Sequence, residues 1–345
     1  MNVMICATQV PFVRGGAEVL VEGLRDALLE RGHRVDVVAL PFKWYPREQI
    51  PRMALAWRLL DLTEANGVPV DLVICTKFPT WAVRHPRKVA WVIHQHRQAF
   101  DWFGTPMSEF TNTPDDYALR RRIAEVDRRG LSECVARYAI SANVAQRLCE
   151  STGLDAKTLR VPIRLRGLGP ESFEDFILSV SRLDQAKRVD RLLEAMAAAG
   201  GSFRAVIVGE GPEAARLRAL AAKLHLQERV EFPGRLPDHD VVRLYNHARA
   251  VYYGPLDEDY GLVTVEAFAA GKPVLTVADA GAVLELVDDG VNGLVAGCAD
   301  GPAIAPALAR LMGDEALARR MGAAGQRRAA EIRWDRVVDR LLSHG

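Results

Sequence analysis

Hydrophobic residues follow two alternating patterns along this chain. Short runs rich in β-branched residues predict buried strands, and longer stretches with an apolar residue at every third or fourth position predict amphipathic helices. Strands and helices that alternate in this way are typical of parallel sheets built from βαβ units. In the first half we expect strands at residues 2–7, 34–39, 71–75, 88–93 and 137–140, and helices at 17–31, 53–66 and 116–136.

The same alternation begins again in the second half. Here we expect strands at residues 176–180, 205–208, 230–232, 250–253, 273–276 and 293–296, and helices at 188–198, 214–224, 238–248 and 262–270. Between the two series, residues 160–175 contain two prolines and two glycines that interrupt both periodicities, which predicts a linker.

The predicted fold class is α/β, with two Rossmann-like, doubly wound parallel-sheet domains at residues 1–165 and 166–330. Residues 331–345 include an amphipathic stretch, 334–342, that we expect to form a terminal helix crossing back to the first domain. A chain of 345 residues with 49% hydrophobic side chains has enough apolar material for two cores. Open α/β sheets bind ligands at the carboxyl ends of their strands, so we expect both domains to face a central cleft and to share one active site.

The cysteines and the lengths of the apolar stretches indicate the compartment in which we expect the protein. The five cysteines (Cys6, Cys75, Cys134, Cys149 and Cys298) include no close pair, which favours a reducing cytoplasm and argues against a disulfide frame or a zinc knuckle. The longest apolar stretches are far shorter than the roughly 20 residues that span a bilayer. The start of the chain has no basic segment or small-residue cleavage site of a signal peptide, and we interpret it as a first strand.

Charge is distributed unevenly between the halves. Residues 1–165 hold 23 Lys and Arg against 18 Asp and Glu, a net +5, and the remainder holds 22 against 26, a net −4. A basic first half suits an acidic acceptor or peripheral contact with the inner face of a membrane, but ordinary surface composition also explains so small a difference. We expect no nucleic acid partner.

The most informative segment is residues 254–274. A strand ends near Tyr253, an acidic loop follows, and Gly261 permits a tight turn before a helix that begins near Leu262 and carries Glu266. Such a helix start offers unpaired N–H groups and a positive dipole end to an anion. Glu258 in the loop and Glu266 in the helix therefore offer two acceptors to one polyhydroxylated ligand. The alternative is a pair of surface carboxylates beside an ordinary helix.

A second segment, residues 179–195, places two cations after a strand. Arg182 and Lys187 lie in a loop before the next helix. Two cations at the carboxyl end of a strand, opposite a helix N-terminus in the same domain, can bracket a diphosphate. Taken alone, they are equally explained as solvated loop charges.

Together these segments resemble glycosyltransferase family 4, of the GT-B fold. The order and spacing of six motifs agree over residues 176–296. They are Ser181-Arg182-Leu183-Asp184 with Lys187, Val208-Gly209-Glu210-Gly211-Pro212, Glu231-Phe232-Pro233-Gly234, Glu258 to Glu266, Gly271-Lys272-Pro273-Val274 and Gly290-Val291-Asn292-Gly293-Leu294. The first half matches more loosely, through Gly15-Gly16-Ala17-Glu18 and His94.

The resemblance implies roles by position. Arg182 and Lys187 resemble the family's diphosphate ligands, and Glu266 resembles its acceptor for the ribose hydroxyls. The donor-sugar contacts of the family fall at Glu258, Asp259, Tyr260, Gly261 and Leu262. The common Glu-Gly-Phe-Gly is Glu-Asp-Tyr-Gly here, and its extra carboxylate bears on sugar preference.

Further positions in both halves are implied in the same way. Gly209 belongs to the donor-binding motifs, and Arg235 with Leu236 falls where the family's loop lies along the nucleobase. Gly15 and Gly16 let the first-domain loop approach the phosphates closely. His94 resembles the histidine that points toward the transferred sugar. The linker lacks the family's usual asparagine-glycine-valine-aspartate, so no acceptor or hinge contact is inferred from it.

The function implied is that of a retaining, metal-independent glycosyltransferase. His94, Arg182, Lys187 and Glu258 are the expected catalytic residues, with a UDP-sugar or GDP-mannose as co-substrate and no cofactor. The acceptor is a glycan, a lipid-linked saccharide or a small molecule. No carboxylate in the motifs is placed as a covalent nucleophile, so we expect the leaving diphosphate to help deprotonate the acceptor on the same face. A nucleotide-sugar epimerase and a non-catalytic nucleotide-sugar-binding protein are the alternatives.

Other features allow rival interpretations. The acidic triplet 257–259 could be a metal site of the other large glycosyltransferase fold, and His94 with His96 could ligate a metal from one face of an extended segment. Gly209 to Pro212 lacks the full dinucleotide fingerprint, which argues against a dehydrogenase. Two further features each fit either acceptor binding or an ordinary structural role, namely the aromatic stretch 91–105 and the basic helix with Arg120, Arg121, Arg122, Arg128 and Arg129.

Overall fold

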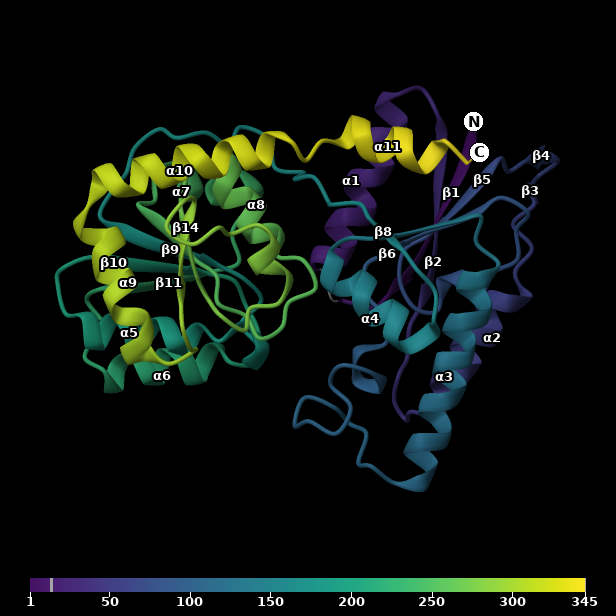
Figure 1. Cartoon of the computed structure of the whole chain (residues 1–345), viewed down its shortest axis with the longest axis horizontal. Coiled ribbons are helices and arrows are strands. Elements are labelled where there is room, and N and C mark those ends of the chain that lie inside the picture. The colour runs from purple at the N-terminus through teal and green to yellow at the C-terminus, as the bar shows by residue number, and fades with distance from the viewer. Residues whose placement is uncertain (13–14, 345) are drawn as a thin grey trace. The chain divides into compact units, whose positions relative to one another are not determined.

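A computed structural model describes residues 1–12 and 15–344, and these residues form two compact units (Figure 1). Unit 1 contains Met1–Val161 and the chain from Arg333 onward, and unit 2 contains Pro162–Ile332. The boundary between Val161 and Pro162 lies in the stretch where prolines and glycines interrupt the helix and strand patterns. The chain therefore leaves unit 1 once and returns to it for its last helix.

Unit 1 is built on a parallel sheet of six strands, in the order β2-β1-β5-β6-β7-β8. The two central strands β5 and β6 are buried at every position, as expected of a parallel sheet covered on both faces. The strands are β1 Asn2–Gln9, β2 Arg34–Pro41, β5 Leu72–Cys75, β6 Lys88–Val92, β7 Ala136–Ala139 and β8 Lys157–Thr158. The helices are α1 Gly16–Glu30, α2 Gln49–Leu59, α3 Pro114–Ser132, α4 Ala142–Thr152 and α11 Trp334–Leu342, with short turns η1 Thr80–Ala82 and η2 Arg97–Ala99.

The last helix, α11, packs on unit 1 beside α1 (Figure 1). The Trp334 ring meets Trp91 of β6 edge to face, with 6.2 Å between ring centroids. Gly23 of α1 lies against the same ring, and a Cβ at that position would come within 2.5 Å of Trp334. The Tyr138 hydroxyl lies 2.9 Å from His344 Nε2. These contacts anchor α11 to both a helix and the sheet of unit 1.

Unit 2 repeats the architecture with the strand order β11-β10-β9-β12-β13-β14, again all parallel. In sequence order this is the 3-2-1-4-5-6 arrangement of a Rossmann fold. The strands are β9 Phe176–Val180, β10 Arg204–Val208, β11 Val230–Gly234, β12 Ala250–Tyr252, β13 Val274–Val277 and β14 Gly293–Ala296. The helices are α5 Val189–Ala199, α6 Ala214–Lys223, α7 Asp238–His247, α8 Leu262–Ala269, α9 Gly301–Gly313 and α10 Glu315–Ala330, with turns η3 Gln185–Lys187 and η4 Ala282–Glu285.

The doubly wound parallel sheets agree with the sequence prediction, but the helix predicted at 53–66 is wrong in its second half. Helix α2 ends at Leu59, and residues 64–69 form a small antiparallel hairpin of β3 (Glu64–Ala65) and β4 (Val68–Pro69). Asn66 and Gly67 between them have φ of 52° and 76°, as expected of a type I′ hairpin turn, which needs positive φ at both positions. Helices α4, α9 and α10 were not predicted.

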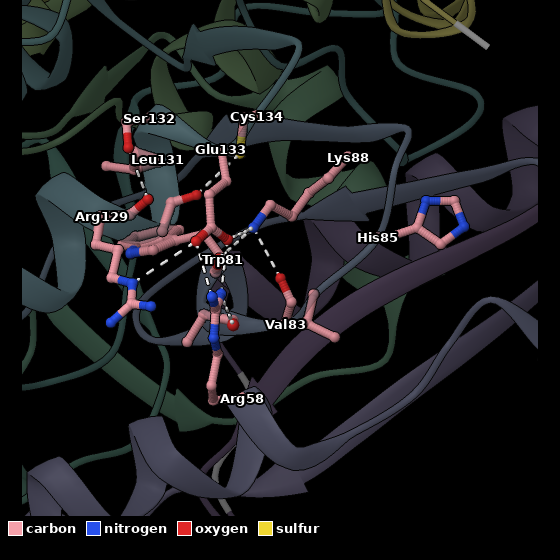
Figure 2. Close-up of polar contacts among 12 residues, drawn as sticks. Arg58, Trp81, Val83, His85, Lys88, Arg129, Leu131, Ser132, Glu133 and Cys134 are labelled. Carbon is pink, nitrogen blue, oxygen red and sulfur yellow. Dashed lines mark hydrogen bonds and ion pairs between the residues drawn. The ribbon is translucent and has the colours of Figure 1, made fainter.

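A buried lysine connects the amino-terminal end of β6 to neighbouring segments of unit 1 (Figure 2). Lys88 begins β6 and is fully buried; its Nζ donates to Trp81 O (2.8 Å), Val83 O (2.7 Å) and Glu133 Oε2 (3.1 Å). Arg58 of α2 donates to both oxygens of Glu133, at 2.6 and 2.9 Å. All three protons of the ammonium are used, so a cation can stay in the core. Burial raises the pKa of Glu133, but hydrogen bonds from Arg58 and Lys88 outweigh it, and the pKa is lowered.

All five cysteines carry free thiols, with Cys6, Cys75 and Cys134 buried and Cys149 and Cys298 exposed. Burial raises the pKa of the Cys75 and Cys134 thiols, which keeps both protonated. Among the helices of the described residues, none combines the length and the hydrophobicity needed to cross a bilayer.

Candidate functional site

The strand order of unit 2 identifies where its ligand site should lie. Strand β9 has β10 on one side and β12 on the other, so the chain winds in opposite directions from this point. Open α/β sheets bind ligands in the crevice outside the carboxyl ends of the two strands at such a switch. The segments that leave these ends are residues 181–187 after β9 and residues 253–261 after β12. Both of the sequence segments with candidate chemistry therefore begin at one point of the sheet.

Three side chains from these segments meet, and we call Lys187, Tyr253 and Glu258 the switch-point cluster. The Lys187 ammonium forms an ion pair with Glu258 Oε2, although 71 positions separate the two residues. The Tyr253 hydroxyl donates to the same Oε2 at 2.7 Å and accepts from Lys187 Nζ at 3.3 Å. The side chains of Lys187 and Glu258 remain 22% and 15% exposed, so a ligand can reach both.

The loop that carries Glu258 is held by hydrogen bonds between its backbone and the backbone of the loop after β13. Glu258 N donates to Ala280 O at 3.1 Å, and Ala282 N donates to Glu258 O at 2.9 Å. Gly281 between these partners has φ of 65°, and a Cβ there would lie 2.5 Å from Glu258 N. The guanidinium of Arg188 pairs with both oxygens of Asp279, at 2.7 and 2.8 Å, and donates to Gly254 O at 3.0 Å. The acidic loop is therefore a fixed platform.

Glu266 lies on α8, which begins directly after Gly261 (φ 84°). Its carboxylate accepts a hydrogen bond from the buried Tyr245 hydroxyl at 2.9 Å. Burial raises the pKa of Glu266 to about 7; the Tyr245 hydrogen bond opposes this rise and the charge of Asp238 adds to it. The residue keeps a partly accessible edge. A carboxylate poised in this way can accept from hydroxyl groups of a ligand near neutral pH.

The loop after β9 rests on the loop after β10. Leu183 N donates to Glu210 O at 2.9 Å, and Gly209 N donates to Gly234 O at 2.9 Å. Gly209 has φ of 138°, and a Cβ there would come within 1.8 Å of Ser181 O, so only glycine fits this approach. Gly209 thus supports the backbone beneath the candidate ligand loop.

The remaining donor-side predictions occupy exposed or loop positions of unit 2. Arg182 is 57% exposed, with its Nε 3.8 Å from Asp184 Oδ2. Arg235 is exposed and Leu236 is half-buried, in the loop between β11 and α7. Asp259 and Tyr260 are both buried next to Glu258, and Leu262 is the first residue of α8.

In unit 1, Gly15 and Gly16 form the start of α1. Gly15 is the residue before the helix, and its N–H donates to Glu18 Oε2 at 2.8 Å. Its φ of −145° is ordinary extended backbone, so the glycine provides space here and not an unusual turn. Glu18 Oε1 also lies 3.3 Å from Lys77 Nζ, which follows β5. Because β1 and β5 flank the switch point of this sheet, Lys77 is a polar residue at a ligand-binding position that sequence reasoning missed.

His94 follows β6 and is half-buried. Its Nδ1 lies 2.7 Å from Gln95 O, and a carbonyl only accepts, so Nδ1 carries the proton. The Gln95 amide donates to Asp127 Oδ2 at 2.7 Å, and Trp81 Nε1 donates to the other oxygen of Asp127 at 2.9 Å. Burial raises the pKa of Asp127 to about 7, an effect that these two hydrogen bonds oppose. His94 is thus attached to a buried polar chain.

The residues that allowed rival interpretations have defined surroundings in the structure. His96 is buried among the rings of Phe42, Phe78 and Phe110, and burial lowers its pKa to about 4. Over residues 1–12 and 15–344, no group of three His, Cys, Asp or Glu side chains is arranged to hold a metal ion. On the basic helix, Arg128 pairs with Glu125 and Arg129 lies 3.8 Å from Glu133. Arg120 stacks on the Phe103 ring of the aromatic stretch at 4.7 Å, while Arg121 and Arg122 are exposed.

Two tyrosines of unit 2 were also missed by sequence reasoning. Tyr253 stands directly after β12 and Tyr245 lies on α7, and each donates to a carboxylate that the sequence singled out. A signal for Tyr253 was present, since it is the last polar-tipped residue at the carboxyl end of a predicted strand. Tyr245 gave none, because its contact with Glu266 depends on how two helices pack.

Comparisons with known proteins bear on the same part of the chain. Residues 166–328, which include the whole switch-point cluster, match the family described as glycosyl transferases group 1. The chain is 35% identical over 187 residues to a D-inositol 3-phosphate glycosyltransferase of Nocardia farcinica, a match that covers 51% of this chain and 41% of the relative. A protein of that name from Corynebacterium glutamicum is 25% identical over 385 residues, covering 99% and 90%.

Most of the more similar curated relatives are matched over only part of their length. The chain spans about half of such proteins or less, for example 50% of the D-inositol 3-phosphate glycosyltransferase of Frankia alni, at 33% identity. The matches concentrate on about half of this chain, 51% and 55% of it in the first two cases.

Solved structures resemble the chain over its whole length. Sucrose-phosphate synthase from Thermosynechococcus elongatus matches with a TM-score of 0.78 and 19% identity, covering 99% of this chain and 100% of that one. Anabaena Alr3699/HepE in complex with UDP and glucose matches with a TM-score of 0.72 and 19% identity, covering 99% of each. At this identity the likeness shows the fold, two Rossmann-like domains in series.

Proposed function

We propose, since residues 166–328 match the family described as glycosyl transferases group 1 and the chain has the GT-B fold, that this protein transfers a sugar from a nucleotide-sugar donor to an acceptor hydroxyl. The observation that carries the proposal is the switch-point cluster. Lys187 and Glu258 are brought together at the carboxyl end of β9 and β12, where a Rossmann sheet binds its ligand. A cation and a carboxylate side by side suit a ligand that is anionic at one end and hydroxylated at the other.

Each group of unit 2 has a proposed part of the donor to bind. Lys187, aided by Arg182, neutralises the diphosphate, and Glu258 accepts hydrogen bonds from the sugar hydroxyls. Glu266 accepts from the ribose hydroxyls, and the loop with Arg235 and Leu236 lies along the base. UDP is the first donor nucleotide to test, because a protein of the same fold, Anabaena Alr3699/HepE, has been solved with UDP and glucose. GDP is the second.

The proposed transfer retains the anomeric configuration and uses no metal. The acceptor hydroxyl attacks from the face that the diphosphate leaves; the bond between the anomeric carbon and the phosphate oxygen breaks, and the departing phosphate takes the hydroxyl proton. Lys187 and the N–H groups at the start of α8 stabilise the charge that develops on the diphosphate. His94, whose Nδ1 proton is held by Gln95 O, is assigned to the side of the site where the sugar is transferred.

A panel of nucleotides tests the donor half of this proposal. UDP, GDP, dTDP and ADP are added to the protein with EDTA or with magnesium, and the unfolding temperature is measured. A ligand that binds only the folded state raises it, by an amount equivalent to about 2.7 kcal/mol at a hundred times its dissociation constant. We expect one or two of the four to stabilise the protein equally with and without EDTA. Stabilisation that appears only with magnesium excludes the metal-independent site.

The acceptor half is tested by turnover. Nucleoside diphosphate released from UDP-glucose or GDP-mannose is measured alone and with candidate acceptors, including inositol phosphates, glycans and lipid-linked saccharides in anionic vesicles. A transferase releases it rapidly only with its acceptor. An epimerase changes the donor sugar without any acceptor, and a non-catalytic binding protein does neither.

A further inference from the structure

We propose that Glu258 forms an ion pair with Lys187 until a donor diphosphate displaces the Glu258 carboxylate from the lysine. Tyr253 is the positioning residue that then holds the Glu258 carboxylate where it binds the sugar. This inference rests on the proposed function, because it describes how the same site passes from its free to its donor-bound state. It adds Tyr253, and an order of events, to the roles already proposed for Lys187 and Glu258.

The geometry places the Tyr253 hydroxyl at the centre of the exchange. Its proton is donated to Glu258 Oε2 at 2.7 Å, while its oxygen accepts from Lys187 Nζ at 3.3 Å. The ammonium also lies 5.6 Å from the centre of the Tyr253 ring. Burial and the neighbouring Glu258 raise the pKa of this hydroxyl, so it keeps the proton that it donates. Lys187 and Glu258 thus share one buried, protonated partner.

The ion pair between Lys187 and Glu258 neutralises the two charges that the proposed site offers to a ligand. A diphosphate carries at least two negative charges, so it competes with the single charge of Glu258 for Lys187. When the diphosphate takes the ammonium, Glu258 loses its ion pair with Lys187 but keeps the Tyr253 hydroxyl and the N–H of Asp259, 3.3 Å from its Oε1. The oxygen lone pairs released from Lys187 become available to sugar hydroxyls.

Two consequences distinguish this exchange from a site that is already open. Glu258 opposes nucleotide binding and favours sugar binding, so its removal should strengthen one ligand and weaken the other. The diphosphate also has to bind before Glu258 can bind the sugar, so a free monosaccharide should not bind by itself.

The first experiment uses Glu258→Gln, which keeps the size of the side chain and removes its charge. UDP and GDP are titrated by calorimetry, and whichever binds the native protein is paired with UDP-glucose or GDP-mannose. We expect the variant to bind the nucleoside diphosphate three- to tenfold more tightly and the nucleotide sugar more weakly. A nucleoside diphosphate affinity that is unchanged or reduced overturns the exchange.

The second experiment uses Tyr253→Phe, which keeps the ring and removes the hydroxyl. Loss of a hydrogen bond to a charged group is worth roughly a tenfold change. We therefore expect the nucleotide sugar to bind about tenfold more weakly, with the nucleoside diphosphate changed less than threefold. A purely structural role would weaken both ligands alike, and that result, or no change in either, overturns the positioning role.

Tyr252→Phe is the matched control. Tyr252 is the preceding residue, its side chain is also buried, and its hydroxyl donates to the backbone oxygen of Arg188 at 3.3 Å and not to the side chain of Lys187 or Glu258. We expect both ligands to bind this variant within twofold of the native protein. Urea unfolding of all three variants shows which are folded under the titration conditions.

Failure of the inference and failure of the proposed function give different results. If the native protein binds none of UDP, GDP, dTDP and ADP, the donor site itself is wrong and the inference falls with it. If the native protein binds one of them but Glu258→Gln gains no affinity, the donor site stands and the exchange is wrong.

Discussion

Glu266 has an environment that makes its charge depend on pH within the physiological range. Burial raises the pKa of this carboxyl from 4.5 to about 7, so between these values the unfolded chain is ionised while the folded protein remains protonated. The folded state then binds more protons, so the contribution of Glu266 to stability falls as pH rises from about 4.5 to about 7. If Glu266 binds the ribose as we propose, the bound ribose reverses this disadvantage, because its hydroxyls donate to the ionised form.

We predict that the effect of Glu266→Gln on nucleotide binding depends on pH. At pH 8 the variant should bind the nucleoside diphosphate about 5- to 20-fold more weakly than the native protein, because a charge-assisted hydrogen bond is lost. At pH 6 the difference should nearly vanish, because native Glu266 is largely protonated. Calorimetry at both pH values measures it, and titration of the phosphate cancels between the two proteins. Parallel affinities at both pH values contradict the assignment to ribose.

The sequence predicted the charged residues of the candidate site but not the tyrosines that donate to its carboxylates. Lys187, Glu258 and Glu266 were predicted from loop and helix positions, and the switch point does bring the first two together. The tyrosines that hold the carboxylates could not be predicted from spacing alone. Tyr245 and Glu266 are 21 positions apart, and their contact joins α7, which precedes β12, to α8, which follows it.

At the scale of elements, turns decide how close two loops can come. Gly209 combines φ of 138° with a position where a Cβ would lie 1.8 Å from Ser181 O. We predict that Gly209→Ala lowers the free energy of unfolding by about 3 kcal/mol or more, from backbone strain and overpacking together. Urea unfolding measures this. Gly297→Ala, where a Cβ has open space, should stay within about 0.5 kcal/mol of the native protein.

The contacts of Lys88 join a strand, a turn and two helices, and they give a second prediction for unit 1 (Figure 2). Glu133→Ala should destabilise the protein by about 2 kcal/mol, because it leaves a buried ammonium without its charged acceptor. Glu125→Ala, which removes an exposed pair with Arg128 at 2.7 Å, should change stability by less than about 0.5 kcal/mol. Equal losses in urea unfolding argue that Glu133 has no special role.

The pH dependence of stability gives a second measurement of the role of Glu133. The pKa of Glu133 is lowered in the folded protein, so its contribution is present above the ordinary value of 4.5 and is lost as pH falls through the folded pKa. The native protein should therefore lose its advantage over Glu133→Ala in acid.

Elements with one uniform period were predicted well, and elements interrupted by local chemistry were not. Phe176–Val180 agrees with its prediction in both bounds, because a short and mostly apolar run allows only a strand or a core helix, and its length of five residues favours a strand. The helix predicted at 53–66 was extended past its end, because apolar residues at 60 and 62 continue the pattern while Asn66-Gly67 imposes a hairpin turn.

At the scale of the whole molecule, His94 belongs to unit 1, whereas Lys187 and Glu258 belong to unit 2. We predict that His94→Ala leaves nucleoside diphosphate affinity within about twofold and lowers the rate of transfer at least tenfold, since a positioned imidazole contributes that much or more. Lys187→Ala should instead weaken the nucleotide itself. If His94→Ala loses as much nucleotide affinity as Lys187→Ala, His94 belongs to the nucleotide site and its proposed role is wrong.

The return of α11 to unit 1 bears on how the protein is made. Unit 1 emerges first during translation, yet the helix that covers Gly23 and Trp91 is synthesised only after all of unit 2. At about 5 to 20 residues per second, the 171 residues of unit 2 delay it by roughly 10 to 30 seconds. For that interval, the nascent unit 1 exposes the apolar surface on which Trp334 later packs, and a chaperone can recognise such a surface. Unit 2 has time to finish folding before unit 1 is complete.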